Sequence, residues 1–365
     1  MKYLFIIQGD GRGHLTQAIA LYEMLLRHDH QVVEVLIGRS AIREIPKFVY
    51  DRIKAPCSMF DAPSFVFSKD RKHINILKTI LYNTTPRSLR KYLRSMEYIH
   101  HHIRDSRPDI IVNFYEVLGG LAHLCYNIKA PLINVGHQYM ARHPSYTFGK
   151  GENRNLMFFR LHVALSNINA SKTLALSFYP LATEASDRLR VVPPLLRREV
   201  LELKPVSGPS VLGYILNAGF QQEVEEWHKA HPEVRLDFFW DKKNVPSELV
   251  VDPSLTFHTI NDSKFLNYMA SCRAYISTGG FESICEAMYL GKAVMMIPAH
   301  VEQEVNARDA ASTQLAIIGD RFDMSRLLDF ASTHPAHNAE FRAWVDSAED
   351  TFIKELGVEG SNRSL

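Results

Sequence analysis

The chain has 365 residues, of which 46% are hydrophobic and 22% are charged, an ordinary composition for a globular protein with room for two domains. The net charge of +2 is too small for the overall charge of the protein to indicate nucleic-acid binding. The four cysteines form no Cys-x-x-Cys pair, which predicts reduced thiols. No apolar run approaches the roughly 20 residues of a membrane span, and Met1 leads directly into the first strand, so we expect a cytoplasmic protein.

The first predicted strand, residues 3–7, runs into a glycine-rich loop and then a helix to about residue 28. A second apolar strand at 32–37 completes a β–α–β unit and predicts a parallel sheet. The loop glycines are spaced G-x-G-x-G and not G-x-G-x-x-G, and no clear ribose-binding acid ends the second strand. We therefore expect no dinucleotide or other cofactor.

The segment from residue 69 to 107 is basic, with ten Lys or Arg residues against three Asp or Glu. Apolar residues recur in it at helical spacing. The basic residues between them are Arg87, Arg90, Lys91 and Arg94. One interpretation is a solvated helix face. The other is a membrane-surface patch that gathers a lipid-linked acceptor, which would make the protein peripheral on the inner face of a membrane.

Two further apolar strands of the first domain, IIVNF and LINV, are each followed by polar residues. Glu116 follows the first strand, and His137 and Gln138 follow the second. Ligands of open α/β sheets bind at the carboxyl ends of strands, so we expect these side chains to face a cleft. A buried core histidine is an equally supported interpretation of His137.

The strand expected at residues 173–177 is the last of the first domain. A proline-rich stretch, VVPPLLRREVLELKPVSGPS, then precedes a fresh apolar strand at 211–216 and a second alternation of strands and helices. The expected divisions are an N-terminal domain over 1–200, a C-terminal domain over 201–335, an amphipathic helix over 336–357 and a flexible tail over 358–365.

The most informative stretch is 274–307. An apolar strand there runs into Thr278, Gly279 and Gly280, and a helix over about 281–290 follows. The free N–H groups of a helix start and the positive end of its dipole point at the same spot. The sequence therefore predicts an anion site at this turn.

Polar residues follow the turn on the same helix and on the next one. Ser283 and Glu286 lie three apart on a face that we expect to be off the sheet. The Glu286 carboxylate could accept hydrogen bonds from the two vicinal hydroxyls of a ribose. The alternative is a surface glutamate, although no Lys or Arg stands three or four residues away. The next helix carries Glu302, Gln303 and Asn306, which are either sugar-hydroxyl contacts or ordinary residues of a helix start.

This stretch resembles the nucleotide-sugar signature of the GT-B glycosyltransferases. The matching positions are Gly279-Gly280, Ser283, Glu286, Gly291, Pro298, Glu302-Gln303 and Asn306-Ala307. The chain is similar in this respect to the UDP-glycosyltransferases and the peptidoglycan lipid-linked N-acetylglucosaminyltransferases. The resemblance implies two doubly wound Rossmann-like domains that face each other across a cleft, with the C-terminal helix folded back across their junction.

The resemblance also implies roles for residues of the N-terminal domain, which holds the acceptor in this family. The loop GRGHLTQA resembles the family's glycine loop, in which Gly11 and Gly13 would let the acceptor and the sugar approach the backbone. His14 stands where inverting members place their general base; its alternative role is to cap its helix. Glu116 resembles the acidic partner that orients the base. In the C-terminal domain, a backbone group near Ile260 would contact the nucleobase.

The implied activity is inverting, metal-independent transfer from a nucleoside-diphosphate sugar, by preference a UDP-sugar, to a glycan, lipid or small-molecule acceptor. Thr278 stands where retaining members carry a glutamate, and no Asp-x-Asp motif is present to hold a divalent ion. One alternative is a UDP-N-acetylhexosamine 2-epimerase, whose Thr-Glu-Arg run is absent here. Another is a non-catalytic sugar-nucleotide-binding protein.

Overall fold

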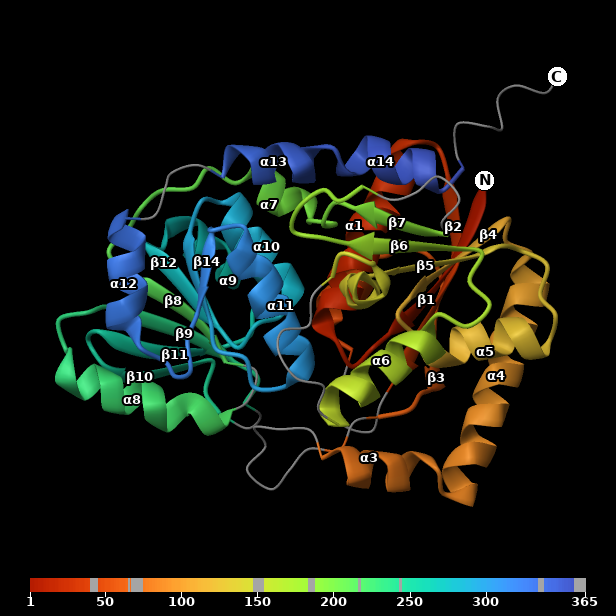
Figure 1. Cartoon of the computed structure of the whole chain (residues 1–365), viewed down its shortest axis with the longest axis horizontal. Helices are drawn as coiled ribbons and strands as arrows, with labels where there is room; N and C mark the ends of the chain where they lie inside the picture. The colour runs from red at the N-terminus through yellow and green to blue at the C-terminus, as the bar shows by residue number, and fades with distance from the viewer. Residues whose placement is uncertain are drawn as a thin grey trace. The chain divides into compact units, whose positions relative to one another are not determined.

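The computed structural model describes residues 1–39, 45–64, 66, 75–146, 154–182, 188–215, 218–242, 245–333 and 338–357. The chain forms two compact units (Figure 1). The first unit comprises Met1–Val66, Ile76–Arg197 and the chain from Trp344 onward, and the second comprises Phe67–Asn75 and Arg198–Ala343. Within the described ranges, no helix is both long enough and apolar enough to cross a membrane.

The first unit is built on a seven-stranded sheet of order β3-β2-β1-β4-β5-β6-β7, in which every pairing is parallel. Its strands are β1 (Lys2–Gln8), β2 (Gln31–Arg39), β3 (Cys57–Asp61), β4 (Ile110–Phe114), β5 (Leu132–Gly136), β6 (Lys172–Leu176) and β7 (Leu189–Val192). The inner strands β1, β4 and β5 are mostly apolar and buried because both faces of the sheet are covered. The expectation that the sheet ends at residue 177 is wrong, since β7, which runs into the start of the proline-rich stretch, pairs with β6.

The helices of the first unit follow the strands in alternation. They are α1 (Arg12–Arg27), α2 (Lys47–Arg52), α3 (Ile76–Asn83), α4 (Pro86–Ser106), α5 (Val117–Cys125), the 3-10 helix η1 (His137–Arg142) and α6 (Arg154–Ser166). The strand order reverses between β1 and β4, so the loops after these two strands form the topological switch point where ligands of such sheets bind.

The second unit repeats this plan with a sheet of order β10-β11-β9-β8-β12-β13-β14. Its strands are β8 (Val211–Ile215), β9 (Leu236–Trp240), β10 (Glu248–Asp252), β11 (Leu255–Thr259), β12 (Ala274–Ser277), β13 (Ala293–Met296) and β14 (Ala316–Ile318), and only the β10–β11 pair is antiparallel. The helices are α7 (Arg198–Glu202), η2 (Ala218–Phe220), α8 (Gln221–Ala230), α9 (Asp262–Ser271), α10 (Phe281–Tyr289), α11 (Val301–Ser312) and α12 (Met324–Thr333). The predicted fold, two doubly wound Rossmann-like units, is confirmed.

The C-terminal segment consists of two helices, α13 (Ala339–Asp346) and α14 (Ala348–Glu355), where one was expected. The break falls at Ser347, whose hydroxyl donates a hydrogen bond back to the Trp344 carbonyl over 2.7 Å. Contacts within the first unit hold the part of this segment from Trp344 to Glu355: the Trp344 indole donates to the Ser177 carbonyl over 3.0 Å, and Glu349 pairs with Arg27 at 2.7 Å.

Candidate active site

The glycine turn of the second unit lies at the carboxyl end of β12. β12 neighbours β8 where the strand order reverses, so the turn occupies the switch point of this sheet. Gly279 has φ +96°, a conformation that favours glycine, and a Cβ atom there would lie 3.2 Å from the Met296 Sδ-methyl carbon. Gly280 is the N-cap residue of α10, and no side chain there accepts a hydrogen bond from the first turn. The N–H groups of this turn can therefore donate to a bound anion.

Residues of α11 hold the turn from the other side. Asn306 Nδ2 lies 3.4 Å from the Gly279 carbonyl oxygen, and the backbone N–H of Ala299 donates to Gln303 Oε1 over 2.9 Å. The Cβ position of Gly279 is 3.4 Å from Gln303 Cβ. The structure therefore brings the residues predicted to bind the donor sugar nucleotide together. Asn306 also contacts the Gly279 turn, and Gln303 also accepts from the backbone at Ala299. Glu302 is partly buried in the first turn of the same helix.

Glu286 is buried, with 2% of its surface exposed. The expectation that it lies off the packed face is wrong, because every residue of α10 except Ser283 is buried, so this helix has no solvated side for it. Glu282 and Asp309 are buried as well, and together with burial itself these carboxylates raise the pKa of the Cys285 thiol. The interpretation of Glu286 as a solvated surface glutamate does not hold.

Ile260 directly follows β11 and precedes Asn261, the N-cap of α9. The strands from β11 to β12 are parallel through β9 and β8. Their carboxyl ends therefore share one edge of the sheet, and the backbone near Ile260 lies on the same edge as Thr278.

His14 lies in the first turn of α1, at the switch point of the first unit, and is 6% exposed. Its Nδ1 is 3.3 Å from Gln17 Oε1, and its Nε2 is 3.4 Å from the amide nitrogen of Gln138. Because Gln17 Oε1 can only accept, we assign the ring proton to Nδ1, so the unprotonated Nε2 accepts from the Gln138 amide in this structure. The ring centroid of Tyr115 lies 5.5 Å away.

Burial lowers the pKa of His14 to about 4; the Gln17 hydrogen bond opposes this shift and the nearby His162 adds to it. At neutral pH the imidazole is uncharged and carries the lone pair that a general base requires.

Glu116 does not orient His14 as expected. Its Oε1 accepts a hydrogen bond from the backbone N–H of Leu118 over 3.1 Å, which caps α5, and a Cβ atom on Gly38 would lie 2.5 Å from its Oε2. Across the described ranges its side chain forms no hydrogen bond to His14. The residues that hold the ring are Gln138, which was predicted as a cleft residue, and Gln17, which the sequence analysis missed although its i, i+3 spacing from His14 places it on the same helical face.

Glu116 should make the folding free energy depend on pH. Burial, reinforced by Asp10, raises its pKa from 4.5 to about 8, so the folded state keeps a proton that the unfolded state has released. Stability should therefore fall as pH rises between these values, by about 1.5 kcal/mol from pH 6.5 to 8. The lowered pKa of His14 acts in the opposite direction but only below 6.5.

Urea denaturation at several pH values measures this slope. Glu116→Gln keeps the capping oxygen and should reduce the change of the unfolding free energy with pH. The control Glu97→Gln, at an exposed position on α4, should leave this change as in the wild type. An unchanged slope in Glu116→Gln would show that another group titrates in this range.

The remaining predicted residues of the first unit surround the start of α1 and the end of β5. Gly11 is the N-cap of α1, and a Cβ atom there would come within 3.0 Å of His14 Cδ2. Gly13 lies in the first turn, where its carbonyl accepts from Thr16 Oγ1. His137 is 2% exposed, and its Nδ1 lies 2.7 Å from the Leu176 carbonyl oxygen, which favours its interpretation as a core histidine.

Comparison with known proteins gives relatives along nearly the whole chain. The chain is 26% identical over 337 residues to an uncharacterized glycosyltransferase of Methanosarcina acetivorans, covering 84% of this chain and 80% of the relative. The kitacinnamycin glycotransferase has a TM-score of 0.65 at 16% identity and covers 98% of both chains. The spinosyn rhamnosyltransferase SpnG, complexed with thymidine diphosphate, has a TM-score of 0.58 at 14% identity and covers 98% of this chain and 100% of its own.

The two solved structures are too distant in sequence to show more than the shared fold. The family model of glycosyl transferase family 1, however, matches residues 1–335. The chain belongs to glycosyl transferase family 1 and is a glycosyltransferase with the GT-B fold.

Proposed function

We propose that this glycosyltransferase moves a sugar from a UDP-sugar to an acceptor hydroxyl, with inversion and without a metal ion. The observation that carries the proposal is the turn of Gly279 and Gly280 at the uncapped start of α10. Backbone N–H groups aimed at one point, with a positive helix end behind them, stabilise the negative charge that develops on a departing diphosphate. The second unit would hold the donor and the first unit the acceptor.

His14 is the proposed general base. The acceptor hydroxyl would replace the long hydrogen bond from the Gln138 amide to Nε2. The Nε2 lone pair would then take the hydroxyl proton as the oxygen attacks the anomeric carbon in line with the departing diphosphate. Gln17 and Gln138 would fix the ring and its tautomer. Thr278 stands where retaining relatives carry a glutamate, which supports transfer with inversion at the anomeric carbon.

A pyrimidine nucleotide is supported by the spinosyn rhamnosyltransferase, which was solved with thymidine diphosphate. The test is to incubate the protein with UDP-sugars and with TDP-sugars, with and without an acceptor extract, and to measure the released nucleoside diphosphate. Acceptor-dependent release supports transfer. A 2-epimerase would instead change the sugar, and release without an acceptor would indicate hydrolysis.

We further propose a cytoplasmic protein that contacts a membrane peripherally through the basic segment 69–107. α4 has an apolar face buried against the sheet and leaves Leu89 and Leu93 exposed beside its cations. Each basic residue near an anionic surface contributes about 1 kcal/mol. Sedimentation with phosphatidylserine vesicles at low salt tests this, and a wild-type protein that stays in the supernatant would contradict it.

A further inference from the structure

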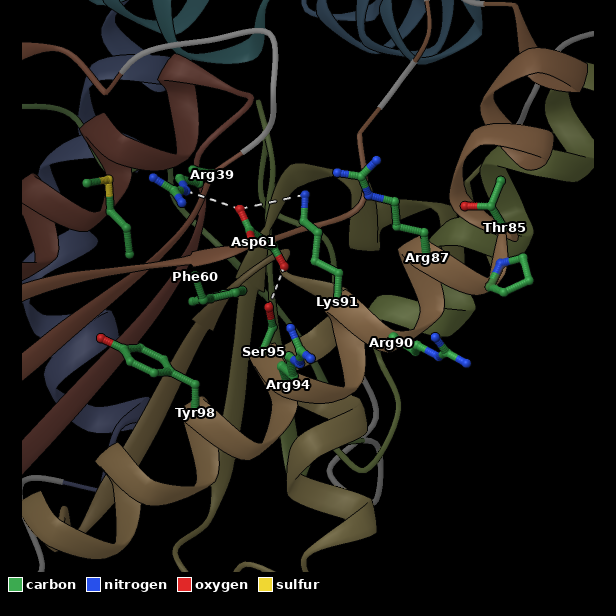
Figure 2. A pocket seen from close by; sticks show the side chains of 12 residues that line it. Arg39, Phe60, Asp61, Thr85, Arg87, Arg90, Lys91, Arg94, Ser95 and Tyr98 are labelled. Atoms are coloured by element: carbon green, nitrogen blue, oxygen red, sulfur yellow. Dashed lines mark hydrogen bonds and ion pairs between the residues drawn. The ribbon is translucent and has the colours of Figure 1, made fainter.

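A pocket of about 900 Å³ opens in the first unit between α4 and the ends of β2 and β3 (Figure 2). Such a volume is within the range of about 300–1,000 Å³ that small-molecule sites occupy. None of its lining residues belongs to the candidate active site. They are Arg39, Met59, Phe60, Asp61, Thr85, Pro86, Arg87, Arg90, Lys91, Arg94, Ser95 and Tyr98.

The lining is strongly cationic. It contains five basic side chains and one acidic side chain, so 5 − 1 leaves a charge of +4. Asp61 is engaged by two of the cations, with Arg39 Nε at 3.1 Å and Lys91 Nζ at 3.6 Å, and Figure 2 shows these two side chains approaching it from opposite sides. In the described part of the chain, no carboxylate pairs with the other three cations, which are Arg87, Arg90 and Arg94 of α4.

These arginines are placed by helical spacing. Arg87, Arg90 and Arg94 lie three and four residues apart, so they follow one side of α4. The opposite side is fixed by the buried Met96 and Ile99. Within the pocket, the Ser95 hydroxyl anchors the helix by donating to the Asp61 carbonyl over 2.7 Å. The cations therefore stand on a rigid element.

We propose that this pocket binds a phosphate or diphosphate group carried by the acceptor. The proposal rests on the proposed transferase function in that it names the acceptor's chemical class. A planar guanidinium donates two parallel hydrogen bonds to phosphate oxygens, and several arginines together match a multiply charged group. A single carboxylate would leave most of the +4 charge unneutralised.

Two sources share this chemistry, a phosphorylated soluble molecule and a lipid phosphate. Exposed apolar side chains lie on α4 and on α3, which packs against it. On α4, Leu89 is 50% exposed and Leu93 is 62% exposed. On α3, no residue is buried and Leu77 is 68% exposed. An apolar tail next to the phosphate would cover such side chains, and a sugar phosphate would not.

The first experiment is calorimetric titration of the full chain with inorganic pyrophosphate at about 0.15 M salt, where exposed long-range attraction is screened. Saturating UDP is present so that the start of α10 is already occupied. The triple variant Arg87→Gln, Arg90→Gln, Arg94→Gln should bind pyrophosphate at least about tenfold more weakly, because charge-assisted hydrogen bonds are lost. The matched control is Lys54→Gln, Arg104→Gln, Lys129→Gln, which removes the same charge from exposed positions outside the pocket and should bind like the wild type.

The second experiment separates the sources by competition with farnesyl diphosphate and with glucose 1-phosphate. Tighter binding of farnesyl diphosphate than of pyrophosphate identifies a lipid phosphate, and equal or tighter binding of glucose 1-phosphate identifies a soluble one. If the two triple variants lose pyrophosphate affinity equally, or the wild type does not bind it, the inference is wrong. UDP affinity is measured separately and reports on the proposed donor site. Failure of the proposed donor site is therefore distinguishable from failure of the phosphate site at α4.

Discussion

Replacing His14 by alanine should lower the turnover number of sugar transfer by about 10²–10⁴-fold, the usual contribution of a general base. UDP affinity should change little, because the proposed nucleotide site belongs to the second unit. Initial rates at saturating donor and acceptor, together with calorimetric UDP binding, measure the two effects separately. Transfer at near wild-type rate by His14→Ala would exclude this residue as the base.

The pH profile sharpens this test. A base with a pKa of about 4 stays in its reactive form down to mildly acidic pH, so kcat/KM should hold its value to about pH 5 and fall below it. A histidine with an ordinary pKa would lose activity already near pH 6.5. The fall should be absent in the residual activity of His14→Ala.

His137→Asn provides the matched control. It removes a second buried histidine of the first unit, but one whose Nδ1 is engaged by the Leu176 carbonyl. Turnover should stay within a few-fold of the wild type, and a thermal melt shows whether any loss reflects unfolding. A loss as large as that of His14→Ala in a folded variant would show that the effect is not specific to His14.

The features that the sequence predicted correctly are local ones. The turn at Gly279 and Gly280 follows an apolar strand and precedes an amphipathic helix, and each of these signals is contained within a few neighbouring residues. His14 lies, as expected, in the helix that follows β1, and its role as a base stays a prediction. A parallel sheet then follows from the alternation of strands and helices, so two doubly wound units were predictable.

The features that were missed depend on residues distant in sequence. Glu116 was expected to face His14, but its carboxylate caps its own helix and lies beside Gly38, 78 positions earlier, where the absence of a Cβ atom leaves room for it. The lowered pKa of His14 comes first from its burial, and the nearby His162, 148 positions later, lowers it further. The position of β7 depends on pairing with β6 and not on its own four residues.

Removing the carboxylate of Glu286 should raise the UDP dissociation constant by about tenfold to a hundredfold, since a charged hydrogen-bond acceptor contributes about 1.5–3 kcal/mol. Glu286→Gln is preferable to alanine because the side chain is buried, and a variant of equal volume opens no cavity. Glu282→Gln is the matched control: it neutralises a second buried carboxylate in the first turn of the same helix, and it should leave UDP affinity nearly unchanged.

The comparison of two ligands decides whether Glu286 acts through the ribose. Wild-type protein should bind 2′,3′-dideoxy-UDP about tenfold to a hundredfold more weakly than UDP, because the hydroxyls that Glu286 is proposed to accept from are missing. In Glu286→Gln the two ligands should bind with more nearly equal affinity, so that the two losses are not additive, as for any directly interacting pair. If the variant keeps the full wild-type preference for UDP, the ribose is held by other groups, and the carboxylate of Glu286 serves the packing of α10.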